Sequence, residues 1–507
     1  MACFLTDDDR FCEKYESKIN DMNQSNKTLF HSLWGMVLLS LFTPVLLFGQ
    51  SAAVPLSLQA AVDSALMNNS RVKQYREMVA QKKALVKVAK GNYLPTLNVH
   101  GGYTWLSENP EVNMDLVKNS LDANLQEFGQ ALAQSGAIPA NLLPVFGGIM
   151  QGIGQMSMPN IVIDQKDYFN LNATVLQPVY TGGKITAGVR FAKADAARAH
   201  EQLKGIRNKL TRETIKNYYS VVLLKQVIQT RKNVLRGMQK HESQAEKAFQ
   251  IGMIGTQDLL RAKVAVANAE RDLSDDQNKL ALAMMALKTN MGVKADTKIR
   301  LTDTLKFIAV PFSLDDLQME ARGHQTIFKI IDQQEKMLQQ KKVVDRAAFL
   351  PQLAAWGEYS AYQDNYPVIM PPVMVGVQAK INLFDGLKKF NRLKATQHQQ
   401  KQLSDARQFA HQQVSLWVNQ SYRKVLDARE RYLKLKPTLA LSAENLKITE
   451  KRFQEGLSKS VDVIDARLLD EKVKIERLHT LYDYNLALAD VYLATGQAQK
   501  AVEVLNR

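Results

Sequence analysis

The sequence predicts a mixed α/β membrane protein in which four barrel strands per chain are followed by long α-helices of coiled-coil type. Three observations indicate this fold class. Two halves of the chain match each other at constant offsets, four segments of about ten residues alternate apolar and polar side chains, and the run from Gly183 to Gln250 keeps helical periodicity without a proline.

The chain is an internal duplication. Phe249 to Ala262 reads FQIGMIGTQDLLRA, and Phe453 to Ala466, 204 residues later, reads FQEGLSKSVDVIDA. Upstream of Gly182 the offset becomes 256, so that Tyr93-Leu94-Pro95 matches Phe349-Leu350-Pro351 and the first copy has about 52 extra residues. We therefore expect an N-terminal extension with a signal peptide over 1–50, a first repeat over 51–292 and a second repeat over 293–507.

Each copy of this motif predicts a reversal of the chain. A glycine and a short polar turn inside a long helical pattern allow two helices to run back beside each other. The expected tips lie near 250–257 and 454–461. Their turn residues are Phe249, Gly252, Gly255, Phe453, Gly456, Ser458 and Lys459.

The apolar run from Leu33 to Phe48 is typical of the core of a secretory signal peptide, since a spanning helix needs about 20 residues. The alternative is an uncleaved inner-membrane anchor. Residues 1–21 are acidic and polar, and we expect them to be dispensable or to reflect a misassigned start. Cys3 and Cys12 precede the run, so disulfides and thiolate metal sites are not expected in the mature chain.

Charge and motifs argue against several other functions. Lys and Arg outnumber Asp and Glu by 66 to 50, but they are spread along helical faces, which indicates a solvated surface and no nucleic-acid partner. The eight histidines are scattered, and neither a G-x-S-x-G motif nor a phosphate loop occurs. We expect no enzymatic activity, no cofactor and no metal site.

The strand pattern is clearest in the second copy, where 373–384 alternates without exception and 351–362 alternates more weakly. The first copy has Leu97 to Trp105 and Phe169 to Val175, after a helix expected over 56–90. These lengths fit outer-membrane barrel strands, although a soluble sandwich would show the same alternation.

The helices favour the barrel. The run to Gln250 would be roughly 100 Å long, far more than a globular domain spans. The return helix has an apolar residue at every seventh position from Leu259 to Leu287, and the second copy repeats the long helix from Gly386 to Gln454. Four strands cannot close a barrel alone, so the barrel must be shared between chains. Two chains would give eight strands and three would give twelve, and the pattern itself leaves this open.

The order of these elements over residues 56 to 500 resembles the TolC-like outer membrane factors. The resemblance implies a homotrimer in the outer membrane of a Gram-negative bacterium, with a shared 12-stranded barrel, contacts to outer membrane lipid and a helical tunnel through the periplasm. It also implies the function, a passive exit duct of a tripartite efflux pump or type I secretion system. A periplasmic adaptor and an inner-membrane RND or ABC transporter would dock at the helical tips and open it.

The resemblance also implies a gate. Aspartates after the second tip form a constriction ring in that family, and the matching residues here are Asp462 and Asp465, with Asp258 and Arg261 in the first copy. Arg261 can pair across to Asp465. Without the resemblance, the two aspartates would be ordinary solvated helix residues. In that family, tip contacts among an aromatic residue, an arginine and acidic partners help to hold the closed state. Here Phe453 lacks a hydroxyl and Ser458, beside Lys459, stands at the arginine position, so we expect any such latch to have different partners.

The extra residues of the first copy form a long connection over 106–166. Met114 to Gln134 has helical character, and a glycine-rich stretch runs from Gly147 to Gly154. Between two barrel strands this loop would lie outside the cell, where its apolar content suggests a plug or cap. The alternative for the whole chain is an exported coiled-coil scaffold or adhesion protein with a soluble β-sandwich.

Overall fold

The computed structural model describes residues 54–135, 139, 141–156, 159–309, 311–364 and 371–506. The expected signal peptide, Cys3 and Cys12 lie outside the described residues. All the elements discussed below, apart from the first residue of β1 (Val54–Leu56), belong to one compact unit, Pro55–Arg507.

The two repeats build matching helices of equal or nearly equal length. In the first repeat, α2 spans Leu58–Asn68, α3 Ser70–Gly91, α6 Lys184–Gln250 and α7 Thr256–Met291. The second repeat has α8 Leu314–His324, α9 Thr326–Ala347, α10 Lys388–Gln454 and α11 Ser460–Ala494, followed by α12 Ala498–Leu505. Both α6 and α10 contain 67 residues, so each is roughly 100 Å long at 1.5 Å per residue.

The helix expected over 56–90 is in fact two helices, so that prediction was wrong. Asn69 lies between them with its own backbone extended, and its side chain accepts a hydrogen bond from the backbone N–H of Arg71. This N-cap starts α3 where periodicity alone would continue α2, because a capping asparagine satisfies a free helix donor. Gln325 separates α8 from α9 in the second copy with the same extended backbone.

Four antiparallel strands form one sheet in the order β2-β5-β7-β8. They span Thr96–Trp105, Asp167–Tyr180, Gln352–Asp364 and Val373–Lys380. β5 and β7 pair at the centre and come from different repeats, which leaves β2 and β8 at the two edges. β8 ends at Lys380, four residues before the alternating pattern ends, so the prediction of a strand to residue 384 was wrong there. Two small sheets, β1 with β6 (Ile299–Leu301) and β3 (Glu111–Val112) with β4 (Ile161–Val162), complete the strands.

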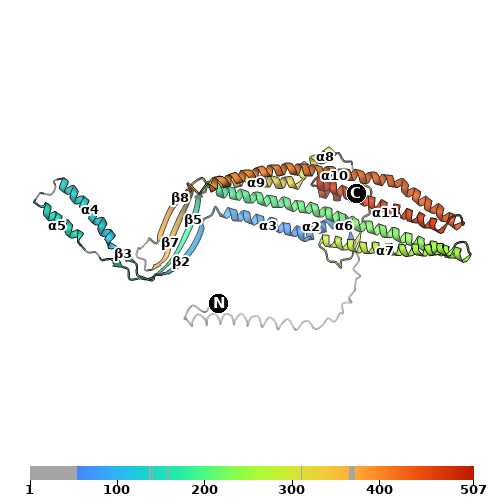
Figure 1. Ribbon diagram of the computed structural model, residues 1–507, viewed down its shortest axis with the longest axis horizontal. Coiled ribbons are helices and arrows are strands. Elements are labelled where there is room, and N and C mark those ends of the chain that lie inside the picture. Colours follow the sequence, from blue (N-terminus) through green and yellow to red (C-terminus); the bar gives the residue numbers. More distant parts are fainter. Residues whose placement is uncertain are drawn as a thin grey trace, which may run out of the picture. The chain divides into compact units, whose positions relative to one another are not determined.

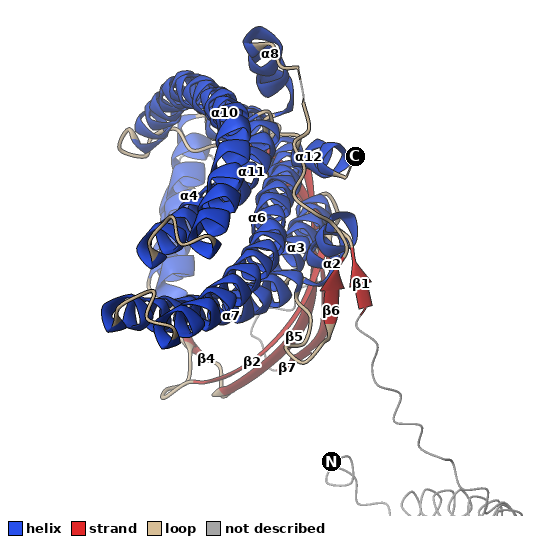
Figure 2. Cartoon of the chain, turned by 90° about the vertical axis from the view of Figure 1, so that its right-hand side faces the viewer, coloured by secondary structure: helices blue, strands red, loops and turns tan. Residues whose placement is uncertain are grey.

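In Figure 1, the four-stranded sheet lies at one end of the long helices, and the turns α6–α7 and α10–α11 lie at the other. Figure 2 views the unit from the end with the turns, with α6, α7, α10 and α11 side by side. α6 contacts α7 and α11, and α10 contacts α11. No helix among the described residues is long and apolar enough to span a membrane.

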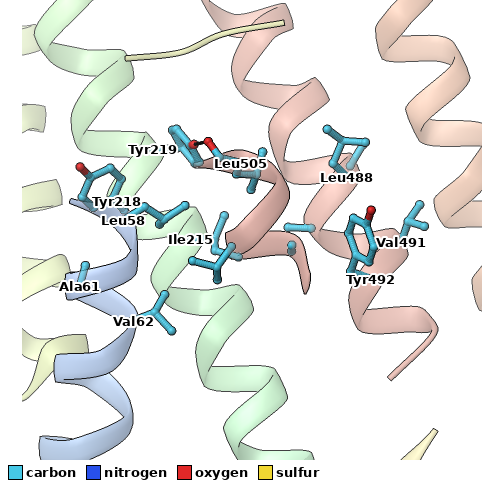
Figure 3. Close-up of a cluster of buried hydrophobic side chains, with 14 of the residues drawn as sticks. Leu58, Ala61, Val62, Ile215, Tyr218, Tyr219, Leu488, Val491, Tyr492 and Leu505 are labelled. Carbon is cyan, nitrogen blue, oxygen red and sulfur yellow. Dashed lines mark hydrogen bonds between the residues drawn. The ribbon is translucent and has the colours of Figure 1, made fainter. Parts of the chain in front are cut away.

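The hydrophobic core lies around the middle of the long helices and joins the two repeats. Leu58 of α2, Ile215 and Tyr218 of α6, and Leu488 of α11 are almost completely buried there (Figure 3). The Tyr218 hydroxyl donates to the carbonyl of Leu56 or to Asp303, both at 2.9 Å. This packing fixes the long helices, and hence the distant turns, relative to one another.

Candidate functional site

The two helix turns that the sequence predicts as tips have the same backbone construction. In the first tip, residues 251–255, Gly252 has φ 76° and its N–H donates to the Phe249 carbonyl at 2.9 Å, while the Met253 N–H donates to the Ala248 carbonyl at 2.8 Å. This pair of bonds is a Schellman motif, which ends a helix at a residue in the left-handed region. Gly255 then stands at the N-cap of α7 with an extended backbone.

The second tip, residues 455–459, repeats these bonds. Gly456 has φ 74°, its N–H donates to the Phe453 carbonyl at 3.0 Å, and the Leu457 N–H donates to the Arg452 carbonyl at 2.8 Å. The Ser458 hydroxyl reaches the Thr449 carbonyl at 3.4 Å, and Lys459 is the N-cap of α11. The tips touch, because a Cβ placed on Gly456 would lie 3.3 Å from the terminal methyl of Met253.

The two tip phenylalanines have different environments. Phe249 is 38% exposed, whereas Phe453 is 8% exposed and packs edge-on against the ring of His241 on α6, with 4.8 Å between ring centroids. His241 Nε2 lies 2.8 Å from the Ser460 hydroxyl of α11, and its buried Nδ1 has no hydrogen-bond partner among the described residues. Burial, assisted by the positive charge of Arg467, lowers the pKa of His241 to about 4. Neutral His241 therefore joins α6 to the second tip.

Asp462 and Asp465 lie on the first turns of α11, three residues apart on one exposed face. The Asp462 carboxylate accepts the backbone N–H of Lys459 at 2.8 Å, which makes it an N3 capping residue. Lys459 has no acceptor on its side chain, so the reciprocal half of a capping box is not possible. Asp258 has the matching N3 position on α7.

The hypothetical pair of Arg261 with Asp465 is not formed within the chain. Both side chains are exposed, and the ion pairs of the described residues include no contact between them. Arg261 instead borders a groove of about 710 Å³ between α7 and α11 near the tips. Its apolar lining comes mainly from Val234, Met238, Leu260, Val264, Ile464 and Leu468.

An ion cluster that the sequence did not reveal connects the first hairpin, α6 and α7, to the second hairpin, α10 and α11. Arg231 of α6 contacts Asp272 (3.2 Å) and Asp276 (3.0 Å) of α7 and Glu471 (2.6 Å) of α11. Burial raises the pKa of Glu471 more than the guanidinium lowers it, whereas hydrogen bonds from Lys279 and Arg231 overcome burial and lower the pKa of Asp276.

A second arginine joins the same helices closer to the tips. Arg467 of α11 pairs with Glu450 of α10 and lies across Gly237 of α6. A Cβ at position 237 would meet the guanidinium, so a larger residue there would push the Arg467 side chain out of this position. No sequence signal marks either arginine, because their partners are distant in the chain or depend on helix packing.

Metal ligands do not gather anywhere in the described ranges, where no group of three or more His, Cys, Asp or Glu side chains could hold an ion. The tips are thus built from helix caps, one buried histidine and ion pairs, an arrangement suited to holding helices together.

The model of the outer membrane efflux protein family matches residues 117–293 and 332–497. The chain belongs to this family. The resemblance to TolC-like outer membrane factors is therefore confirmed, as are the outer membrane location and the role in efflux. The family consists of efflux proteins and is not a family of enzymes.

Solved structures of similar fold agree with this membership. A membrane protein from Pseudomonas aeruginosa aligns at 16% identity over 88% of this chain and 92% of its own, with a TM-score of 0.68. The outer membrane protein VceC from Vibrio cholerae aligns at 15% identity over 87% and 96%, with a TM-score of 0.66. The open state of the Neisseria gonorrhoeae MtrE outer membrane channel aligns at 15% identity over 87% of this chain and 89% of its own, with a TM-score of 0.65. No curated protein matches.

Proposed function

We propose that this outer membrane efflux protein is a passive trimeric exit duct of a tripartite efflux pump or type I secretion system. Three chains would contribute 12 strands to one closed barrel. The observation that carries the proposal is a four-stranded sheet with two unpaired edges, β2 and β8, and exposed apolar side chains. An open edge is not tolerated in hydrocarbon, so the edges must pair between copies.

The apolar side chains of the sheet support contact with lipid. On β8, Val375 and Val377 are 80% and 74% exposed in the single chain, and on β2 Leu97 and Val99 are each 68% exposed. Such exposure is costly in water and favourable against acyl chains. The helices then extend away from the sheet for roughly 100 Å, which suits a tunnel through the periplasm.

The tips are the proposed gate at the periplasmic end. An adaptor protein would dock there and displace the second hairpin from the first, and the apolar groove beside Arg261 is one available surface. The energy would come from an inner-membrane RND or ABC transporter, since the duct itself has no catalytic role. Displacement would break the contact of Arg231 with Glu471 and separate His241 from Ser460.

Asp462 and Asp465 are proposed to face the channel axis. Three copies of each would place six carboxylates around one axis, where mutual repulsion favours bound cations. Asp462 also caps α11, so its role in the ring is combined with a structural one.

Disulfide cross-linking between the sheet edges tests the shared barrel. Val99→Cys on β2 is combined with cysteine at Val373, Val375 or Val377 of β8, in a chain whose other cysteines, Cys3 and Cys12, are replaced by serine. A shared barrel gives covalent trimers on oxidation for the pair in register. The control is Ala173→Cys with Tyr359→Cys, which are direct partners within one sheet and should link only internally. Edge cysteines that never link chains would contradict the proposal.

A further inference from the structure

The connection between β2 and β5 contains two helices, α4 and α5, between the short strands β3 and β4. α4 spans Met114–Gln134 and α5 spans Leu143–Gly154, and the two helices contact each other. The expected helix Met114 to Gln134 is observed, whereas the glycine-rich stretch, taken as loop, is helical. We refer to α4 and α5 as the loop hairpin; in Figure 1 it lies beyond the end of the sheet.

The segments 106–113 and 159–166 form a hydrogen-bonded stem between the sheet and the loop hairpin. On the sheet side of β3 and β4, the Leu106 N–H donates to the Lys166 carbonyl and the Ile163 N–H to the Pro110 carbonyl, both at 2.9 Å. On the hairpin side, the Met114 N–H at the start of α4 donates to the Asn160 side chain at 3.3 Å. The stem continues directly from β2, an edge strand of the sheet.

Charge is distributed unevenly along this insertion. Every residue from Phe128 to Ile163 is uncharged, a run of 36 positions in a chain in which 23% of residues are charged. The charged side chains are confined to the stem and to α4 before Phe128. The part farthest along the insertion from the sheet therefore lacks the charges that keep a water-exposed helix pair soluble.

Both helices present apolar side chains that no other described residue of the chain covers. On α4, Val117, Leu121 and Phe128 follow one helical stripe and are 50%, 42% and 59% exposed. On α5, Val145 and Ile149 are 58% and 56% exposed. The packing of α4 on α5 thus leaves these five apolar side chains exposed, and we refer to them as the apolar surface of the loop hairpin.

We propose that this surface binds the same surface of the other copies, so that three loop hairpins form a helical cap over the outer mouth of the duct. The inference rests on the proposed trimer. Edge strand β2, which continues into the stem, is where neighbouring copies would pair, so the three hairpins begin at the interface between copies. They are then held at high effective concentration, which favours burial of even a modest apolar surface.

The charges on α4 favour a protein partner over a lipid surface. Helices that lie on membranes carry Lys and Arg on their polar face. α4 has three acidic residues and one basic residue, which are Asp115, Asp122, Glu127 and Lys118. An acidic polar face is repelled by anionic headgroups and is well tolerated on the wet side of a helix bundle.

Cysteine cross-linking of the intact protein tests the cap. Leu121→Cys and Phe128→Cys place a thiol on the apolar stripe, and Asn119→Cys places one on the opposite, exposed face of α4; Cys3 and Cys12 are replaced in all variants. We expect disulfide-linked dimers within the trimer for the stripe positions, at least several-fold more than for Asn119→Cys. Equal, low cross-linking at all three positions in a sample of trimeric mass would overturn the cap and leave the duct intact.

Two further readouts separate the remaining outcomes. If the hairpins enter lipid instead, the emission of a fluorophore on the Phe128→Cys thiol will shift to the blue when the trimer is transferred from detergent to vesicles of anionic lipid, and the cap is wrong. If the mass of the detergent-extracted protein is that of a monomer, both the duct and the cap fail. Cross-linking at the stripe together with an unshifted fluorophore is the result that supports the cap.

Discussion

The guanidinium of Arg231 on α6 lies 2.6 Å from the carboxylate of Glu471 on α11, and it is the same group that contacts Asp272 and Asp276 on α7. One arginine therefore ties the second hairpin to both helices of the first. The Glu471 side chain is buried, so the loss of Arg231 would leave an unpaired negative charge inside the protein.

Arg231→Ala should destabilise the protein by about 3 kcal/mol, because it leaves the buried Glu471 carboxylate without a cation, whereas Asp276 keeps its contact with Lys279. Glu471→Gln should cost less, since the amide keeps the shape and removes the charge. In planar bilayers both variants should spend more time open than the parent, as the hairpins are less firmly joined. Thermal unfolding and open probability are the measurements.

The matched control for this prediction is Lys434→Ala, which removes the exposed ion pair of Lys434 with Glu430 on α10. We expect no measurable change from it. Equal open probabilities for Arg231→Ala and Lys434→Ala would exclude the Arg231 cluster from gating.

Acid should weaken the contact of the second tip with α6. The pKa of His241 is lowered from 6.5 to about 4, so its neutral form stabilises the fold. This contribution is fully present above pH 6.5 and is lost as the pH falls toward 4, and it amounts to at most about 3 kcal/mol. The positive charge of Arg467 opposes protonation of the His241 ring, and Ser460 is the hydrogen-bond partner of that ring.

His241→Gln should flatten this part of the stability–pH curve, measured by thermal unfolding between pH 4 and 7. His479→Gln, at an exposed position on α11, is the control and should retain the parent's pH dependence. A parent curve that is already flat over this range would show that His241 does not titrate with a lowered pKa.

Asp465→Asn should weaken divalent-cation block of single-channel current, because it removes three of the six proposed ring carboxylates. It is a cleaner test than Asp462→Asn, which also replaces the charged acceptor of the Lys459 N–H by a neutral amide oxygen and removes a negative charge from the start of α11, at a cost of about 0.5 kcal/mol. Asp275→Asn, at an exposed position of α7 away from the tips, is the control and should leave the block unchanged. Block that is unchanged in the Asp462→Asn, Asp465→Asn double variant would remove both residues from the pore.

The residue before α10 is strained. Leu387 has φ 65° and is the single non-glycine residue with positive φ among the described residues; its counterpart Gly183 has φ 84°. A side chain in this region costs roughly 1–2 kcal/mol, part of which glycine's greater unfolded-state entropy offsets. Leu387→Gly should raise stability by about 0.5–1 kcal/mol, and Gly183→Ala should lower it by about 1 kcal/mol, as measured by thermal unfolding. Destabilisation by Leu387→Gly would mean that its exposed side chain has a packing role in the assembly.

Features set by local chemistry could be predicted from the sequence. Gly252 and Gly456 indicate the positions of the tips, because a Schellman turn needs a residue in the left-handed region. The observed turns lie within the expected ranges 250–257 and 454–461. The repeat itself predicts that α6 and α10 are alike, although α10 contains Pro437 inside the helix and α6 contains no proline. α10 nevertheless continues through this proline as one helix of 67 residues.

Features set by contacts between distant residues could not be predicted. Arg231 meets Glu471 across 240 positions, and His241 meets Ser460 across 219, so no spacing rule connects them. The break at Asn69 was missed because a capping side chain competes with an unbroken apolar period. The helical conformation of 147–154, which is part of α5, was missed because its glycines have a low helix propensity, which context overrides.

The most direct test of the central proposal is planar-bilayer conductance of the detergent-extracted protein, with its oligomer mass determined on the same sample. We expect the mass of a trimer and discrete, cation-selective openings. A water-soluble species that never inserts, or a monomer without conductance, would contradict the duct. The alternating strands would then belong to a soluble sandwich on a helical scaffold.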